Sequence, residues 1–129
     1  MSSSRLTQFS NKKYINLETR RKSGQLVGTP VWFVEDGGTI YVRTDMRSGK
    51  IRRARNNHNV RVVPCDIRGK PKGEWIEGTV QIANKLESTH AKQLIDQKYG
   101  LIGRMLGIMY KLKKVDFAVL SIHFDPINA

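Results

Sequence analysis

Hydrophobic and polar residues alternate through much of the first half of the sequence, a pattern typical of half-buried β-strands. The first alternating stretch covers residues 14–20, and a second β-rich stretch covers 26–34 after the turn signal Ser23-Gly24. We therefore predict a β-hairpin here. Proline has no amide hydrogen to donate to a β-ladder, so Pro30 indicates an edge strand, a bulge or a segment that faces a ligand.

Four further stretches have the composition of strands, and residues typical of turns and loops separate them. They cover residues 39–44, 60–67, 74–83 and 115–124. Helical patterns occupy the remaining segments. We predict a short helix within 4–13, a basic helix at 49–56 with Ser48 as its N-cap, a helix that starts at Asn84 with Glu87 at capping-box spacing and ends at Gly100, and a Met-rich helical segment at 102–112.

The predicted elements follow the order β-β-β-α-β-β-α-α-β, and the short connections between consecutive strands favour antiparallel pairing. A small antiparallel sheet must protect its edge strands, and closure into a barrel removes those edges. We therefore predict a mainly β fold, a six-stranded antiparallel barrel with flanking helices.

The chain has 129 residues, of which 39% are hydrophobic, and we predict a single domain over residues 1–129. No run of about 18 apolar residues occurs, and the first residues lack the apolar core of a secretory signal. We therefore expect a cytoplasmic protein without a membrane partner. The single cysteine, Cys65, has no second cysteine for an internal disulfide and cannot hold a metal ion alone, so we predict no metal site.

The charge balance indicates which classes of ligand the chain attracts. Lys and Arg number 23 against 11 Asp and Glu, which gives a formal net charge of +12. The excess is concentrated between residues 43 and 72, where the only acidic residues are Asp45 and Asp66. Such a field attracts nucleic acid, anionic lipid or phosphorylated small molecules. Three interpretations of this segment are open: a cofactor-phosphate site, a nucleic-acid surface, or a solvated basic face.

One part of the basic segment has the elements of a phosphate site. A predicted strand delivers Arg43 and Thr44 to a loop, and the following helix starts with Ser48, Gly49 and Lys50. Free backbone N–H groups at a helix N-terminus, a hydroxyl and nearby cations together favour a bound phosphate. The glycine spacing of a Walker motif is absent, so the pattern does not predict a nucleoside triphosphatase.

Four stretches in this order resemble a known family. They are Thr19-Arg-Arg-Lys-Ser-Gly24, Val27-Gly-Thr-Pro-Val-Trp-Phe-Val34, Ile40-Tyr-Val-Arg-Thr44 and Ser48-Gly-Lys-Ile-Arg-Arg53. Together they resemble the pyridoxamine 5'-phosphate oxidase-like FMN-binding split β-barrel family, and within it most of all the branch of coenzyme F420-dependent enzymes. The likeness covers about residues 14–83, and the rest fits the family's ending of helix then strand.

This resemblance implies a split β-barrel that forms a homodimer with cofactor sites between its subunits. It also implies which residues hold F420 or FMN. A strand lies along the ring and side chain of the cofactor, and the loop, helix start and neighbouring strand hold its phosphate: Gly28, Thr29, Pro30, Val31, Arg43, Thr44, Arg47, Ser48, Gly49 and Lys50. The C-terminal substrate-binding extension of the classical oxidases has no counterpart before Ala129, so pyridoxamine phosphate is not the expected substrate.

No acid–base or nucleophilic constellation is recognisable, and the histidines His58, His90 and His123 are scattered without ligand spacing. The catalytic residues are therefore unassigned, which suits an enzyme whose cofactor carries the hydride. We predict an F420- or FMN-dependent oxidoreductase that reduces a small organic substrate. The alternatives are a non-catalytic flavin-storage protein and a basic nucleic-acid-binding barrel. The nucleic-acid alternative is disfavoured because Tyr41 is the only aromatic residue between positions 41 and 59.

Overall fold

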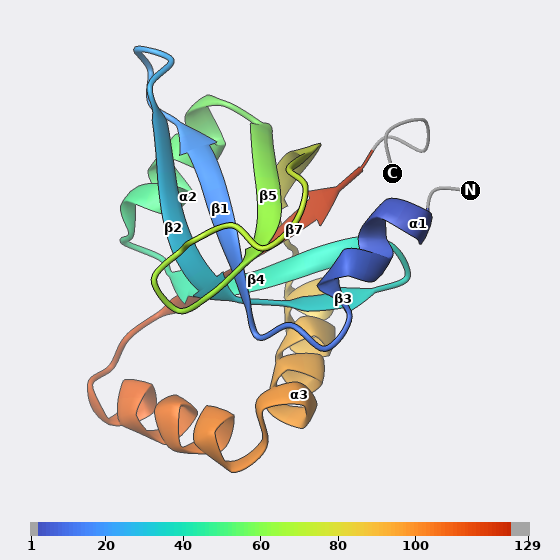
Figure 1. Ribbon diagram of the computed structural model, residues 1–129. Helices are drawn as coiled ribbons and strands as arrows, with labels where there is room; N and C mark the ends of the chain where they lie inside the picture. Colours follow the sequence, from blue (N-terminus) through green and yellow to red (C-terminus); the bar gives the residue numbers. More distant parts are fainter. Residues whose placement is uncertain (1–2, 125–129) are drawn as a thin grey trace.

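A computed structural model describes residues 3–124 and confirms the mainly β fold. Seven strands form one antiparallel sheet in the order β2-β1-β5-β6-β7-β4-β3, and the sheet curls around a central core (Figure 1). The strands are β1 (Tyr14–Arg20), β2 (Leu26–Trp32), β3 (Val34–Asp36), β4 (Thr39–Asp45), β5 (Asn59–Cys65), β6 (Ile76–Ile82) and β7 (Phe117–His123). The helices are α1 (Ser3–Leu6), the 3-10 turn η1 (Thr7–Phe9), α2 (Gly49–Asn56) and α3 (Lys85–Leu112).

The strand count of six was wrong because the stretch 26–34 divides at Phe33. The hydroxyl oxygen of Tyr99 accepts the Phe33 amide hydrogen at 2.9 Å. The Phe33 carbonyl oxygen accepts hydrogen bonds from Tyr99 Oη at 2.7 Å and from Lys98 Nζ at 2.8 Å. Side chains of α3 thus take the backbone groups that a continuous strand would pair, and the chain changes from the β2 ladder to the β3 ladder.

Pro30 lies on an edge strand, as its missing amide hydrogen indicates. β2 is the first strand of the sheet order and pairs only with β1, where Pro30 stands opposite Asn16. The Asn16 side chain donates to the Gly69 carbonyl oxygen at 2.9 Å. The loop after β5 therefore lies against β1 close to this edge strand. That loop begins earlier than predicted, because Asp66 accepts the amide hydrogens of Arg68 and Lys70 and ends β5 at Cys65.

The core fills the inside of the curled sheet. Ile15 and Leu17 of β1 are fully buried, as the alternating pattern predicts. The core also contains side chains from β4, β5, β6 and β7, and α2 adds Ile51 and Ala54. Burial of this apolar surface is the main stabilising contribution to the fold. The predicted helix at 4–13 is shorter in the structure, and its Leu6 and Phe9 complete the same core.

α3 has two segments that meet at Gly100, the residue at which the sequence predicts a helix end. Gly100 has φ 60° and ψ −134°, a conformation that favours glycine, and Figure 1 shows the bend below the barrel. The first segment (85–99) begins at Asn84, whose side-chain oxygen accepts the Glu87 amide hydrogen at 2.8 Å, so the predicted cap is confirmed. The second segment (101–112) extends away from the first.

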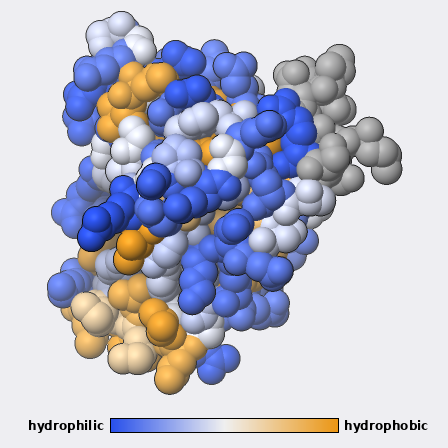
Figure 2. All heavy atoms as spheres, in the orientation of Figure 1, coloured by the Kyte–Doolittle hydropathy of each residue, from blue (hydrophilic) through white to orange (hydrophobic). Residues whose placement is uncertain are grey.

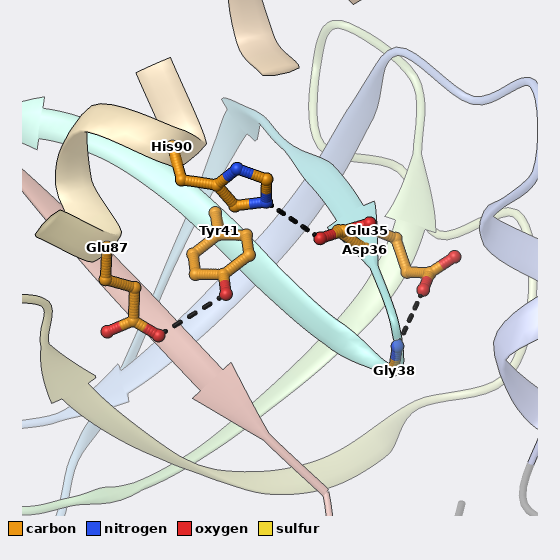
Figure 3. A network of polar contacts seen from close by, with 6 residues as sticks. All are labelled: Glu35, Asp36, Gly38, Tyr41, Glu87 and His90. Carbon is orange, nitrogen blue, oxygen red and sulfur yellow. Dashed lines mark hydrogen bonds and ion pairs between the residues drawn. The ribbon is translucent and has the colours of Figure 1, made fainter. Parts of the chain in front are cut away.

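The first segment of α3 is attached to the outside of the β3–β4 hairpin by apolar and polar contacts. Ala91 and Ile95 are buried against Val34, Tyr41 and Val119. Figure 3 shows two polar links beside this cluster. Tyr41 Oη donates to a carboxylate oxygen of Glu87 at 3.3 Å, and His90 Nε2 lies 3.0 Å from the carboxylate of Asp36. Burial and the nearby Glu87 raise the pKa of Tyr41. No helix in residues 3–124 combines the length and hydropathy of a membrane span.

Candidate functional site

A cleft of about 510 Å³ lies between the end of β2, the end of β4, the start of α2 and both segments of α3. Its volume is within the range of small-molecule and cofactor sites. Six of the ten residues assigned to cofactor binding line it: Pro30, Val31, Arg43, Thr44, Ser48 and Lys50. Elements that are far apart in the sequence therefore meet at one concave surface.

Part of the cleft lining is polar and positively charged. The hydroxyl oxygens of Thr44 and Ser48 lie 3.1 Å apart, so the end of β4 and the N-cap of α2 are linked at the cleft wall. Lys50 is half-buried beside them. Burial lowers the pKa of Lys50 and so does the neighbouring Arg53, whereas Asp45 raises it. A bound anion would compensate the lost hydration of this ammonium group.

The N-terminus of α2 lies beside these groups. Ser48 occupies the predicted N-cap position but makes no side-chain cap hydrogen bond, because its hydroxyl contacts Thr44. In the first turn, the amide hydrogen of Ile51 is donated to the Ser48 carbonyl oxygen at 3.2 Å. The helix dipole favours an anion beside the N-terminus. Two hydroxyls and an ammonium group thus lie together at the start of a helix, where the sequence predicts a phosphate.

The rest of the cleft lining is mostly apolar and largely aromatic. Its lining includes Tyr14, Trp32, Ile95, Leu106, Tyr110 and Phe117. The Trp32 ring is stacked on that of Tyr99, with 4.2 Å between centroids and 5° between planes. The Arg43 guanidinium lies 4.0 Å from the Phe117 ring centroid, and Tyr110 packs edge-on against the same ring. These contacts hold the aromatic side chains in fixed positions.

The four remaining candidate residues lie outside the cleft lining. The Thr29 hydroxyl oxygen is buried without a hydrogen-bond partner among the described residues. A Cβ on Gly28 would lie 2.7 Å from the side-chain oxygen of Asn16, so glycine here allows the two strands to approach closely. The Arg47 side chain is 81% exposed, with its Nε 3.9 Å from Asp45. Gly49 borders a separate cavity on another face of α2.

Comparison with known proteins identifies the architecture that carries this cleft. No family model and no curated protein matches the sequence. Among solved structures, the heme storage protein HutZ of Vibrio cholerae is similar with a TM-score of 0.68 and 14% identity, over 89% of this chain and 83% of its own. A candidate 5-nitroimidazole antibiotic resistance protein of Bacteroides thetaiotaomicron has a TM-score of 0.69 and 15% identity, over 94% and 78%.

A candidate pyridoxamine 5'-phosphate oxidase of Listeria innocua is similar over 94% of this chain and 90% of its own, with a TM-score of 0.65 and 16% identity. The chain has the pyridoxamine 5'-phosphate oxidase-like split-barrel fold. The fold implied by the resemblance is thereby confirmed, with seven strands in place of six. At these identities the likeness concerns the fold alone.

Sequence reasoning missed the apolar half of the split-barrel cleft. Trp32 follows Pro30 at strand spacing, and Gly103, Leu106 and Tyr110 recur at helical spacing on one face of the second segment of α3. The spacing marks each set as one face of its element. The spacing does not show that the two faces meet. They meet because the chain bends at Gly100, and the spacing of either set does not record that bend.

The thiol and the imidazoles of the split barrel lie outside the cleft lining. Cys65 is buried, and burial together with Asp66 raises the pKa of its thiol to about 11, which disfavours a nucleophilic thiolate. His58, His90 and His123 contact Val80 O, Asp36 and Ser121, respectively. Within residues 3–124, no cluster of three or more His, Cys, Asp or Glu side chains has metal-binding geometry.

Proposed function

We propose that this split barrel is an oxidoreductase that binds a phosphorylated flavin or deazaflavin, F420 in preference to FMN, and reduces a small organic substrate. The observation that carries the proposal is that one cleft combines aromatic side chains with hydroxyl and cationic groups. A flat ring system with a phosphorylated side chain requires both kinds of contact. The preference for F420 comes from the sequence resemblance described above.

The polar and the aromatic lining residues have distinct tasks in this proposal. Thr44, Ser48 and Lys50 bind the phosphate, while Pro30 and Trp32 on β2 contact the ring and orient it. The second segment of α3 covers the opposite side and excludes water. When bound, the reduced cofactor supplies the hydride, so the protein needs no nucleophile of its own.

The homodimer implied by the resemblance is part of the proposal. Six large hydrophobic residues of the second segment of α3 are between 48% and 78% exposed: Leu101, Ile102, Met105, Ile108, Met109 and Leu112. Figure 2 shows the corresponding apolar surface at the lower left, where this segment lies. We expect sedimentation to give the mass of two chains and the variant Ile108→Glu to give one. A single-chain mass for the unmodified protein at micromolar concentration would contradict the dimer.

Ligand titration tests the proposed function directly. A charge-assisted contact contributes about 1.5–3 kcal/mol, so Lys50→Ala should weaken FMN or F420 by about ten- to a hundredfold. Riboflavin lacks the phosphate and should bind weakly to both proteins. Arg68→Ala removes equal charge from an exposed turn outside the cleft lining and is the matched control. Equal weakening by both substitutions would indicate a diffuse basic surface and would favour nucleic acid as the ligand.

A storage protein is the second candidate, because HutZ shares the fold and is described as a heme storage protein. The two functions differ in turnover. The oxidoreductase should oxidise many equivalents of reduced cofactor per protein when an electron-poor nitro compound is present. A storage protein should bind one equivalent per site and leave the rate of oxidation unchanged. Stopped-flow absorbance with excess reduced cofactor distinguishes the two outcomes.

A further inference from the structure

A second cavity, of about 340 Å³, lies between α2 and the turn that joins β1 to β2. We call it the outer cavity. Its α2 residues share the helix face opposite the buried Ile51 and Ala54, whereas Lys50 lies on the flank that faces the cleft. Four cations line the outer cavity, two from the turn and two from the helix: Arg21, Lys22, Arg52 and Arg53.

The structure holds Arg53 in place within the outer cavity. Its Nε donates a hydrogen bond of 2.5 Å to the hydroxyl of Thr19, a residue that is fully buried. A Cβ on Gly49 would lie 2.6 Å from Nη1 of the same guanidinium. Glycine at the first position of α2 therefore leaves the space that the Arg53 side chain occupies.

The positive charge of the outer cavity is not balanced by carboxylates. None of its four cations forms an ion pair in the part of the chain that the structure describes, and its other lining residues, Ser23, Gly49 and Asn56, are uncharged. Burial lowers the pKa of Arg53, and the charges of Arg21 and Arg52 lower it further. Like charges gathered in this way repel each other, and a bound anion removes that repulsion.

We propose that the outer cavity binds a group of adjacent phosphates, a pyrophosphate or triphosphate, and that it does so independently of the cleft. The cations converge from two elements on one small volume, and linked phosphates place several negative charges within such a volume. Guanidinium groups match phosphate oxygens with paired hydrogen bonds. A solvated basic face would require neither the Arg53–Thr19 hydrogen bond nor the space at Gly49.

Isothermal titration with inorganic triphosphate at about physiological ionic strength tests this site. We expect Arg52→Gln and Lys22→Gln each to weaken binding by about tenfold, the loss of one charge-assisted contact. Arg55→Gln is the matched control, because Arg55 is exposed on the same helix but does not line the cavity. Its affinity should stay within about twofold of the unmodified protein. Gly49→Ala keeps every charge and should still weaken binding, because the Arg53 guanidinium must move.

Two further measurements make the site assignment falsifiable. Lys50→Ala should retain the triphosphate affinity. If Lys50→Ala lowers that affinity as much as Arg52→Gln does, the triphosphate binds in the cleft and the proposal is overturned. Equal losses in Arg52→Gln and Arg55→Gln would also overturn it, since a diffuse field responds to charge alone. The same titrations with a short DNA duplex identify the source of the phosphate. Tight duplex binding without measurable triphosphate binding would replace this site with a nucleic-acid surface.

Discussion

The two segments of α3 are continuous in sequence but contact different surroundings. The first buries Ala91 and Ile95 against the sheet and uses Tyr99 to hold the backbone of Phe33. The second lines the cleft with one face and exposes apolar side chains on another. The first segment therefore stabilises the split barrel, whereas in our proposal the second contacts the ligand and a second copy of the chain.

The largest difference between the segments should appear in the free energy of unfolding. Ile95 is 3% exposed, and Ile95→Ala should lower that free energy by about 2–5 kcal/mol through lost burial and a cavity. Leu101 is 72% exposed, and Leu101→Ala should lower it by less than about 0.5 kcal/mol at low protein concentration. Urea unfolding measures both. If the second segment is a dimer interface, the effect of Leu101→Ala should grow as the protein concentration rises.

The junction between the segments should respond to substitution in the opposite sense from a glycine beyond it. A Cβ on Gly100 would meet no atom within 4 Å, so Gly100→Ala has only a backbone cost, about 1–3 kcal/mol for a residue at positive φ. Gly107 also has open space around it but lies within the second segment. Gly107→Ala should therefore stabilise the protein by about 0.5–1 kcal/mol. Thermal unfolding of both variants checks the signs, and equal effects would show that the bend is not strained.

Each segment of α3 contains a tyrosine whose hydroxyl can be removed by substitution with phenylalanine, so the contribution of the hydroxyl can be compared between the segments. Tyr99→Phe leaves the Phe33 amide hydrogen without its partner and should cost about 1–3 kcal/mol. The Tyr110 hydroxyl makes no hydrogen bond among the described residues, and its ring packs on Phe117. Tyr110→Phe should therefore change the free energy of unfolding by less than about 0.5 kcal/mol. Comparable losses in the two variants would show that the hydroxyl of Tyr99 is not what divides β2 from β3.

The stability contributed by the first segment should also depend on pH. Burial lowers the pKa of Lys98 to about 8, whereas the pKa of a lysine in the unfolded chain is about 10.4. Between these values the unfolded chain binds more protons than the folded one, so the contribution of Lys98 to stability rises with pH from about 8 to 10.4. The Tm difference between the unmodified protein and Lys98→Met should rise over this range. A constant difference would mean that the ammonium group stays hydrated in the folded protein.

The polar half of the cleft was predictable from the sequence because its parts are close together along the chain. Thr44, Ser48 and Lys50 lie within seven positions, and local rules place a strand end, an N-cap and a helix start in that order. Arg47 lies in the same stretch, yet the structure turns it to solvent. Local spacing identifies the segment that could hold an anion, but the direction of each side chain depends on the packing of that segment.

The sequence by itself determined the positions of most strands, the cap at Asn84 and the break at Gly100, because each depends on the conformational preferences of residues that are neighbours along the chain. Only the tertiary structure decided that the stretch 26–34 forms two strands and that aromatic side chains line the cleft. The division at Phe33 requires Tyr99, which is 66 positions away. Contacts over such distances form only when the whole barrel closes, and no local pattern records them.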